Sequence, residues 1–386
     1  MKILVVNWQD VTHPLGGGAE VHFHEIFSRI ARRGHQVTLC CCSYPGAARG
    51  EWIDGIEILR RGPRALFSCL YPLVYLRELR ARSFDIVIED LNKIPFFTPF
   101  YVKRPLAGIA HHLFRGSIFR ETGPVVGSIV YALESLALAI YRSRMPFCVV
   151  SRSTADEFIR HGFPPQRIAI VENCVDHHRY FVGDSPKSPV PLIGSFGRLK
   201  RYKSVDHFLQ ALPVVLTNMP DLKAIIAGDG DDLSRLKRIA SELGIQRSVE
   251  FTGRLTEEEK VRLLRSLWFT VNTSSKEGWG LTVVEANACG TPAIAADVPG
   301  LRDAVKDEET GLLYPYGDIA ALSQKILWLL KHPDDRRRLI ANALLWAATF
   351  DWEHAADKTL AFLDTVVSQP KGASFFAGAP SGESAS

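Results

Sequence analysis

The sequence lacks the cysteine spacing of a metal-binding or disulfide-bonded domain. Its seven cysteines are Cys40, Cys41, Cys42, Cys69, Cys148, Cys174 and Cys289, and they form no Cys-x-x-Cys pair. Zinc sites are commonly built from two such pairs, so no zinc site is predicted. Nothing in the spacing indicates a disulfide framework either. We therefore expect buried, reduced thiols and a reducing compartment, the cytoplasm.

The sequence also lacks a strong charge bias and a long uninterrupted apolar run. Its 386 residues carry a net charge of +4, which is too small to indicate nucleic-acid binding. Only four apolar residues, Ile3 to Val6, precede Asn7, and this run is too short for a signal peptide. The longest apolar stretch, from Val125 to Tyr141, is interrupted by Glu134, so a membrane-spanning helix is not expected.

The order of apolar segments predicts two α/β domains with doubly wound sheets. A chain of this length exceeds the size at which one hydrophobic core usually divides. Short apolar runs, typical of strands buried on both faces, alternate with helical segments. The strands expected are 3–6, 36–41, 84–89, 192–196, 223–227, 249–252, 269–272 and 292–296, and the helices are 19–33, 204–216, 232–243, 257–266 and 281–288.

Glycine and proline between residues 182 and 190 indicate a linker between the two halves. We expect a first domain at 1–181, a second at 191–350 and a helix at 351–367. The remaining residues, 368–386, are rich in Gly, Ser, Ala and Pro and are expected to be disordered.

Two glutamates eight positions apart lie in the most informative segment, residues 274–286. Glycines follow Glu277, which is expected in a loop, whereas Glu285 is expected on the second turn of the next helix. The backbone amides of Leu281 and Thr282, at the start of that helix, can bind an anion. Such a set suits a ligand that joins a diol to a diphosphate. A glycine-rich loop with two solvated glutamates is the plainer alternative.

A second segment, residues 194–204, places two cations after a predicted strand. It nearly matches the P-loop pattern, but Tyr202 replaces the second glycine and would obstruct the phosphate cradle, so a P-loop nucleotidase is rejected. Arg198 and Lys203 follow the carboxyl end of a buried strand, where open α/β sheets bind ligands. They can neutralise the charge of a leaving diphosphate. A basic surface turn is the alternative.

The first half offers a glycine-rich loop and two histidines. Residues 16–20 are Gly-Gly-Gly-Ala-Glu, but a dinucleotide fingerprint needs glycine where Val21 stands, so the fingerprint of an NAD site is incomplete. His111 and His112 follow an apolar run, and alternation along a strand would let at most one of them face a cleft. The other paired histidines, expected at the surface, are His22, His24, His177 and His178.

Together these motifs resemble those of the retaining glycosyltransferases of family 4, which have the GT-B fold. The resemblance covers about residues 1–365 and is most specific in the second half. It rests on Gly197-Arg198 with Lys203, Ala227-Gly228-Asp229-Gly230, Phe251-Thr252-Gly253, Glu277-Gly278-Trp279-Gly280, Glu285-Ala286, Gly290-Thr291-Pro292 and Thr310-Gly311-Leu312. The chain departs from the family pattern at Cys174, where glycine is usual, and at Trp279, where phenylalanine is more usual.

The resemblance implies roles for individual residues and a C-terminal helix that crosses back to the first domain. Arg198 and Lys203 would hold the diphosphate, Glu277 would bind sugar hydroxyls and His111 would lie near the donor sugar. The donor would also contact Gly17, Gly18, Gly253, Arg254, Gly278, Trp279, Gly280, Leu281, Thr282 and Glu285, with Glu285 at the ribose and Gly253 and Arg254 at the base. We expect no metal ion and no cofactor besides the nucleotide-sugar co-substrate.

The function expected is transfer of a sugar from a nucleotide-diphosphate sugar to a hydroxyl of a glycan, a glycolipid or a small molecule, with retention of configuration. A sugar-nucleotide 2-epimerase of the same architecture is one alternative. An inactive sugar-nucleotide-binding protein is another, and an NAD oxidoreductase is a more distant one. The sequence does not indicate the donor sugar, the base or the acceptor.

Residues 60–82 suggest peripheral contact with the inner face of the cytoplasmic membrane. Basic residues beside exposed aromatic ones suit an anionic interface. This segment has one acid, Glu78, and its arginines are Arg60, Arg61, Arg64, Arg77, Arg80 and Arg82. The apolar stretch 125–141 could extend this face. The alternative is that both stretches are core helices with solvated arginines.

Overall fold

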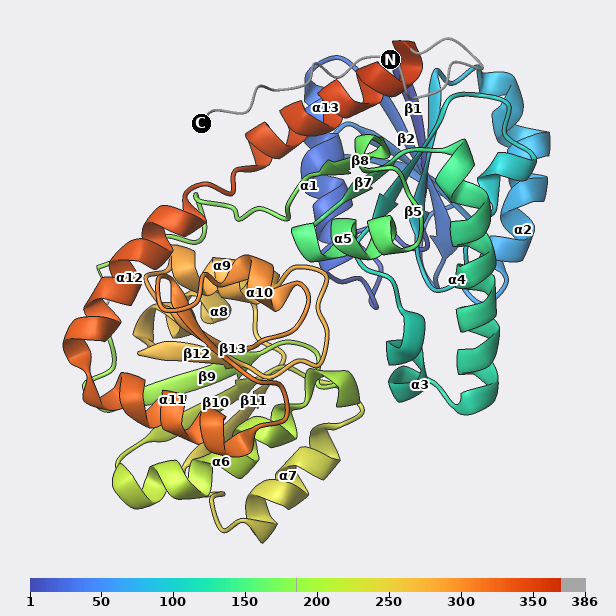
Figure 1. Ribbon diagram of the computed structural model, residues 1–386. Helices are drawn as coiled ribbons and strands as arrows, with labels where there is room; N and C mark the ends of the chain where they lie inside the picture. The colour runs from blue at the N-terminus through green and yellow to red at the C-terminus, as the bar shows by residue number, and fades with distance from the viewer. Residues whose placement is uncertain (185, 369–386) are drawn as a thin grey trace, which may run out of the picture.

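The computed structural model describes residues 1–184 and 186–368, which form two α/β domains (Figure 1). Both domains are Rossmann-like and have mainly parallel sheets, which confirms the predicted fold class. The predicted tail, 368–386, lies outside the described residues except for Ser368, which ends the last helix rather than beginning a tail.

The first domain contains an eight-stranded sheet in the order β3-β4-β2-β1-β5-β6-β7-β8. Among the strands that the structure describes, only β3 and β4 pair in an antiparallel way. Its strands are β1 (Lys2–Val6), β2 (Gln36–Ser43), β3 (Gly50–Ile53), β4 (Ile56–Pro63), β5 (Ile86–Leu91), β6 (Leu106–Ala110), β7 (Phe147–Val149) and β8 (Ile168–Ile170). In β1, near the middle of the sheet, Ile3 and Val5 pack on one face and Leu4 and Val6 on the other, which explains the continuous apolar run of this strand.

The second domain contains a six-stranded parallel sheet in the order β11-β10-β9-β12-β13-β14. The strands are β9 (Leu192–Phe196), β10 (Lys223–Ala227), β11 (Val249–Gly253), β12 (Phe269–Asn272), β13 (Ala293–Ala296) and β14 (Gly311–Tyr314). Each sheet reverses its winding beside its first strand, between β1 and β5 and between β9 and β12. Ligands of open α/β sheets bind at such points, outside the carboxyl ends of the strands.

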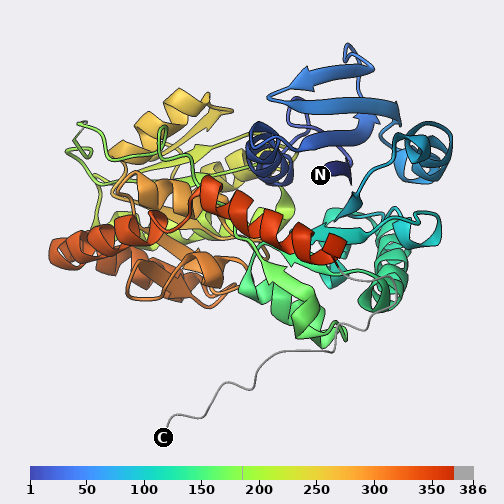
Figure 2. The same ribbon diagram turned by 90° about the horizontal axis from the view of Figure 1, so that it is seen from above.

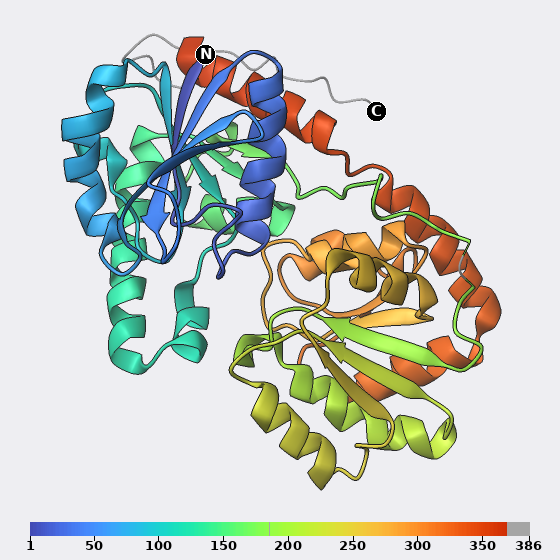
Figure 3. The ribbon, with the colours of Figure 1, turned by 180° about the vertical axis from the view of Figure 1, so that it is seen from behind.

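Helices cover both faces of each sheet (Figures 1 and 3). Those of the first domain are α1 (Gly18–Arg32), α2 (Phe67–Val74), α3 (Ile118–Glu121), α4 (Pro124–Arg144) and α5 (Arg152–Arg160). Those of the second are α6 (Val205–Asn218), α7 (Leu233–Glu242), α8 (Glu257–Ser266), α9 (Leu281–Ala288), α10 (Leu301–Ala304), α11 (Ile319–Lys331) and α12 (Pro333–Ala347).

The last helix, α13 (Trp352–Ser368), leaves the second domain and packs on α1 of the first (Figures 1 and 2). Arg33 at the end of α1 forms ion pairs with Glu353 at 2.8 Å and Asp357 at 2.6 Å. Trp352 and Leu363 of α13 are buried in the same core as Phe27 of α1. The C-terminal helix therefore ties the two domains together.

Residues 60–82 are not the exposed aromatic surface that the sequence suggested. Arg60 is fully buried and donates to the Asp10 carboxylate at 2.7 Å. The side chains of Phe67, Tyr71 and Tyr75 belong to the core that covers one face of the first sheet. That prediction was wrong because α2 must cover Leu4 and Val6 of the central strand and turns its aromatic side inward.

Among the described residues, one helix is long and apolar enough to cross a membrane, by length and composition alone. This helix, α4, packs on the first domain through Leu138 and Tyr141, but it exposes Val125, Ile129 and Leu136. The interrupting Glu134 is buried. It accepts hydrogen bonds from the backbone amides of Phe114 and Arg115 at 2.7 and 2.8 Å.

All seven cysteines are free thiols. Six are buried as expected, and Cys69 on α2 is exposed.

Candidate functional site

Loops at the carboxyl ends of strands from both sheets meet between the domains. The loop after β1 contacts the loop after β9, because a Cβ placed on Gly17 would lie 3.3 Å from the guanidinium Nη2 of Arg198. The loop after β6 contacts the loop after β12, because a Cβ on Gly278 would lie 2.5 Å from the carbonyl oxygen of His111. Only glycine permits that approach, so the interdomain contact explains Gly278.

The two predicted cations lie on the turn that follows β9. Arg198 is exposed, whereas Lys203 is mostly buried. A small pocket at this sheet edge is lined by both side chains together with Gly197, Asn272 and Ser274. The structure therefore brings Arg198 and Lys203 together at the point where the second sheet reverses its winding.

Glu277 lies against Lys203 in the same site. The Lys203 Nζ is 2.5 Å from the Glu277 Oε1, and the Ser274 hydroxyl donates to the same oxygen at 2.6 Å. Burial opposes the charge on Lys203, but the Glu277 carboxylate outweighs it and raises the pKa of the ammonium. Within the described residues no partner lies at Oε2, which leaves that oxygen for a ligand hydroxyl.

The loop that carries Glu277, residues 273–280, is hydrogen-bonded to the turn after β9 that carries Arg198 and Lys203. The Ser275 amide donates to the Tyr202 carbonyl at 2.8 Å, and the Thr273 hydroxyl donates to the Lys203 carbonyl at 3.1 Å. Gly280, with φ of 109°, precedes α9 in a left-handed conformation that favours glycine. Because α9 begins at Leu281, the amides of Leu281 and Thr282 have no acceptor among the described residues and can bind an anion.

Glu285 lies on the second turn of α9, as the spacing predicts, but it is buried. The Nζ of Lys260 from α8 lies 2.8 Å from its Oε2, and this pairing was not foreseen. Burial raises the pKa of the Glu285 carboxyl although Lys260 opposes the shift. The Trp279 side chain is buried too and packs edge-on against Phe350, with ring centroids 5.0 Å apart. Only the backbone of Trp279 is therefore kept as a candidate for donor binding.

His111 lies beside a buried acid in the first domain. Its Nε2 is 3.5 Å from the Oδ2 of Asp90. Asp90 lies in β5, one residue after the end of the predicted strand 84–89. Burial disfavours the imidazolium, but the Asp90 carboxylate outweighs burial and raises the pKa of His111. The ring of His22 lies 5.0 Å from that of His111 and is buried, so the prediction that His22 lies at the surface was wrong. Its ring packs between those of His111 and Trp352, so the loop after β6 and the C-terminal helix α13 cover it.

The side chain of His112 lies against the second domain. Its Nδ1 lies 3.6 Å from the position of a Cβ on Gly278. The ring of His111 contacts His22 and Asp90 of the first domain, whereas the ring of His112 lies against Gly278, so the ring that faces the second domain is that of His112. Burial first, and then the charge of Lys276, lower the pKa of His112 to about 3.

The remaining predicted residues lie at the ends of two other elements. Gly18 is exposed at the start of α1, Gly253 ends β11 at one edge of the second sheet, and Arg254 after it is exposed. In the part of the chain that the structure describes, no three His, Cys, Asp or Glu side chains are grouped to hold a metal ion. Independence of a metal stays a prediction.

Besides Lys260, sequence reasoning missed Asp90, Lys276 and Glu157. Asp90 has a local signal, because it is the last residue but one of the strand Ile86–Leu91, near the sheet edge where ligands bind. Lys276 stands beside Glu277 in the sequence, but the partners it contacts lie in the first domain. Glu157, one of those partners, has no signal that we recognise in the sequence.

Two family models match the chain, one to each domain. The model described as Glycosyltransferase Family 4 matches residues 16–179. The model described as Glycosyl transferases group 1 matches residues 183–346, which include the loops of Arg198 and Glu277.

Curated relatives match part of the chain. A D-inositol 3-phosphate glycosyltransferase of Streptomyces bingchenggensis is 32% identical over 226 residues, which are 53% of this chain and 49% of that protein. The protein of the same name from Rhodococcus erythropolis is 34% identical over 215 residues, 52% and 49% of the two chains. The chain thus spans about half the length of the curated relatives it matches.

Solved structures share the fold over nearly the whole chain. A sucrose-phosphate synthase from Thermosynechococcus elongatus has a TM-score of 0.78 at 20% identity and covers 95% of this chain and 98% of its own. Anabaena Alr3699/HepE in complex with UDP-glucose has a TM-score of 0.74 at 22% identity, and the match covers 95% of this chain and 100% of that one. At these identities the likeness shows the fold alone.

Proposed function

Because the chain belongs to the glycosyltransferases of group 1 and family 4, with the GT-B fold, we propose that it transfers a sugar from a nucleotide-diphosphate sugar to a hydroxyl group. The acceptor would be a glycan, a glycolipid or a small molecule. The anomeric configuration would be retained, and no metal ion or further cofactor would take part.

One observation carries this proposal: Arg198, Lys203 and Glu277 lie together at the carboxyl edge of the second sheet, opposite Gly17 of the first domain. The two cations can hold a diphosphate and offset the charge that grows on it as it leaves. The free Oε2 of Glu277 can accept a hydrogen bond from a donor-sugar hydroxyl. The amides at the start of α9 add an anion site.

The family resemblance implies roles for the other residues of the site. Glu285, which already pairs with Lys260, would bind the ribose, and the backbone at Gly253 and Arg254 would contact the base. His111 would lie near the donor sugar, beside the Asp90 carboxylate. The protein HepE was solved with UDP and with UDP-glucose, which makes UDP-glucose the first donor to try.

A transfer assay with three arms tests the function against its alternatives. The protein is incubated with UDP-, GDP- or ADP-sugars, with and without hydroxyl acceptors, and the products are followed by NMR. Transfer with a retained anomeric centre supports the proposal. A change in sugar configuration with donor alone would identify a 2-epimerase, and binding without either reaction would identify an inactive sugar-nucleotide-binding protein.

We also propose that the first domain docks on the cytoplasmic face of a membrane, now through α4 rather than residues 60–82. Val125, Ile129 and Leu136 are spaced for one side of a helix and are at least 52% exposed. Arg142 and Arg144 are exposed at the end of the same helix and would attract anionic lipid. The docked helix would bring a lipid-linked acceptor near the site.

Vesicle co-sedimentation tests the docking. The protein should bind vesicles that contain anionic lipid, less at high salt, and the Ile129→Ser and Leu136→Ser variants should bind less. Leu73→Ser on α2 is the matched control, because Leu73 is also exposed. A wild-type protein that stays in the supernatant at low salt would refute docking and favour a soluble acceptor.

A further inference from the structure

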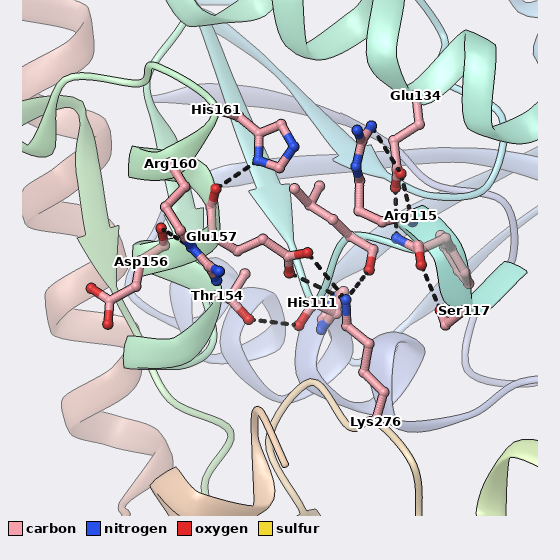
Figure 4. Close-up of polar contacts among 12 residues, drawn as sticks. His111, Arg115, Ser117, Glu134, Thr154, Asp156, Glu157, Arg160, His161 and Lys276 are labelled. Atoms are coloured by element: carbon pink, nitrogen blue, oxygen red, sulfur yellow. Dashed lines mark hydrogen bonds and ion pairs between the residues drawn. The ribbon is translucent and has the colours of Figure 1, made fainter.

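Lys276, one residue before Glu277, reaches out of its own domain and contacts two partners of the first domain (Figure 4). Its Nζ lies 2.5 Å from the carbonyl oxygen of Leu113. The same atom lies 3.2 Å from both carboxylate oxygens of Glu157 on α5. Both charged side chains are mostly buried, at 17% and 15% exposure, so water screens the pair less than it would on the surface.

The loop that receives Lys276 is held from behind. The two amides after Leu113, those of Phe114 and Arg115, donate to the two carboxylate oxygens of Glu134 on α4. The Ser117 hydroxyl donates to the Phe114 carbonyl at 2.5 Å (Figure 4). Because α4 fixes this loop, the Leu113 carbonyl is a rigid acceptor, and the buried Glu134 has a function in the fold.

The helix that carries Glu157 is also held on both sides. Its Thr154 hydroxyl donates to the His111 carbonyl at 3.3 Å within the first domain. Its Ser153 amide donates to Asp303 of α10 in the second domain at 3.0 Å. Thus α5 meets the second domain at two points, Asp303 and Lys276.

Three consecutive residues of loop 273–280 therefore contact different parts of the molecule. Lys276 binds the first domain, Glu277 pairs with Lys203 in its own domain, and Gly278 packs on the His111 carbonyl. A shift of Lys276 would move the backbone on which Glu277 stands. Charge-assisted hydrogen bonds are stronger than neutral ones, so the Lys276 contacts can hold that backbone.

We propose that Lys276 is a positioning residue, which bridges Leu113 and Glu157 and thereby sets the place of the Glu277 carboxylate when the two domains meet. The effect of Lys276 on sugar transfer rests on the proposed function. Its contacts with Leu113 and Glu157 do not depend on that function. Lys276 can hold Glu277 in place only while the first domain contacts loop 273–280.

The variants Lys276→Met and Glu157→Gln test the proposal in the full-length protein. Each should lower kcat for transfer about tenfold to a hundredfold, because a small misplacement of a catalytic group has costs of that order. The Kd for UDP, measured by calorimetry, should stay unchanged, since Arg198 and Lys203 bind the diphosphate within the second domain. Lys358→Met is the matched control, because it breaks a pair with Glu172 that does not involve loop 273–280.

The double variant, Lys276→Met with Glu157→Gln, separates coupling from general damage. It should lose little more activity than Lys276→Met alone, whereas independent roles would give losses that multiply. Unchanged kcat in both Lys276→Met and Glu157→Gln would overturn the proposal. So would losses that multiply in the double variant.

Hydrogen exchange of the free protein distinguishes a failure of this inference from a failure of the function. Lys276→Met should speed amide exchange in residues 113–117 and 274–280 even without a donor. If exchange rises while the wild-type protein transfers no sugar, the bridge stands and the proposed function is wrong. If the wild-type protein transfers sugar and exchange does not change, the bridge is wrong.

Discussion

Removal of Arg198 should abolish most of the turnover and leave the fold intact. The side chain is exposed, and among the described residues no acid pairs with it, so Arg198→Ala should change the free energy of unfolding by no more than about 0.5 kcal/mol. If its guanidinium stabilises the leaving diphosphate, its loss should lower kcat by about 10²–10³, which corresponds to about 2.7–4 kcal/mol.

Lys203→Ala should behave differently, and the difference comes from the structure. Lys203 is mostly buried and pairs with Glu277, so its removal leaves a carboxylate without its cation in a partly buried site. This variant should lose turnover and also melt at a lower temperature, whereas Arg198→Ala should lose turnover only.

The assay is steady-state transfer from the best donor, together with thermal melting followed by circular dichroism. Arg238→Ala is the control, because Arg238 is an exposed arginine on α7 in the same domain and is 68% exposed. Turnover of Arg198→Ala equal to that of the control, with the same melting temperature, would refute the assignment of Arg198 to the diphosphate.

Three further predictions concern Glu285, metal ions and His111. Glu285→Ala should weaken binding of the free nucleoside diphosphate more than Glu277→Ala does, because ribose is common to all donors; calorimetry with the nucleotide and with the full donor gives the comparison, and the opposite order would show that the roles are exchanged. Transfer should survive EDTA, since Arg198 and Lys203 supply the positive charge; activity lost in EDTA and restored by Mg²⁺ or Mn²⁺ would contradict this. The Asp90 carboxylate outweighs burial and raises the pKa of His111 above 6.5. The His111–Asp90 interaction therefore stabilises the folded state fully below pH 6.5, and this stabilisation is lost as the pH rises through the raised pKa. Urea unfolding of Asp90→Asn should therefore differ most from wild type at about pH 6 and less at about pH 9, and a constant difference would exclude this coupling.

Much of the second domain could be predicted from the sequence. The strands β9, β10 and β12 and the helices α8 and α9 begin and end where their apolar runs and turn residues indicate. The first domain was harder. The hairpin of β3 and β4 was missed although Asp54 and Gly55, both with positive φ, form the typical two-residue turn between Ile53 and Ile56. The exposed β3 hides this signal, because it lacks a regular apolar face.

The pairings within the site could not be read from the sequence. Lys203 and Glu277 are 74 positions apart, and Arg60 and Asp10 are 50 apart. A sequence shows such residues as separate charges, and only the fold decides which carboxylate meets which cation. The same reason hid the contacts of Lys276, whose partners lie in the other domain.

Thermal melting with a panel of UDP-, GDP- and ADP-sugars tests the central claim, that a nucleotide sugar binds between the two domains beside Arg198 and Glu277. At a concentration of 100 times its Kd, a ligand specific for the native state stabilises it by about 2.7 kcal/mol. The account predicts that at least one of these donors raises the melting temperature of the wild-type protein and raises that of Arg198→Ala and Glu277→Ala less. No shift with any donor, or equal shifts in all three proteins, would contradict it.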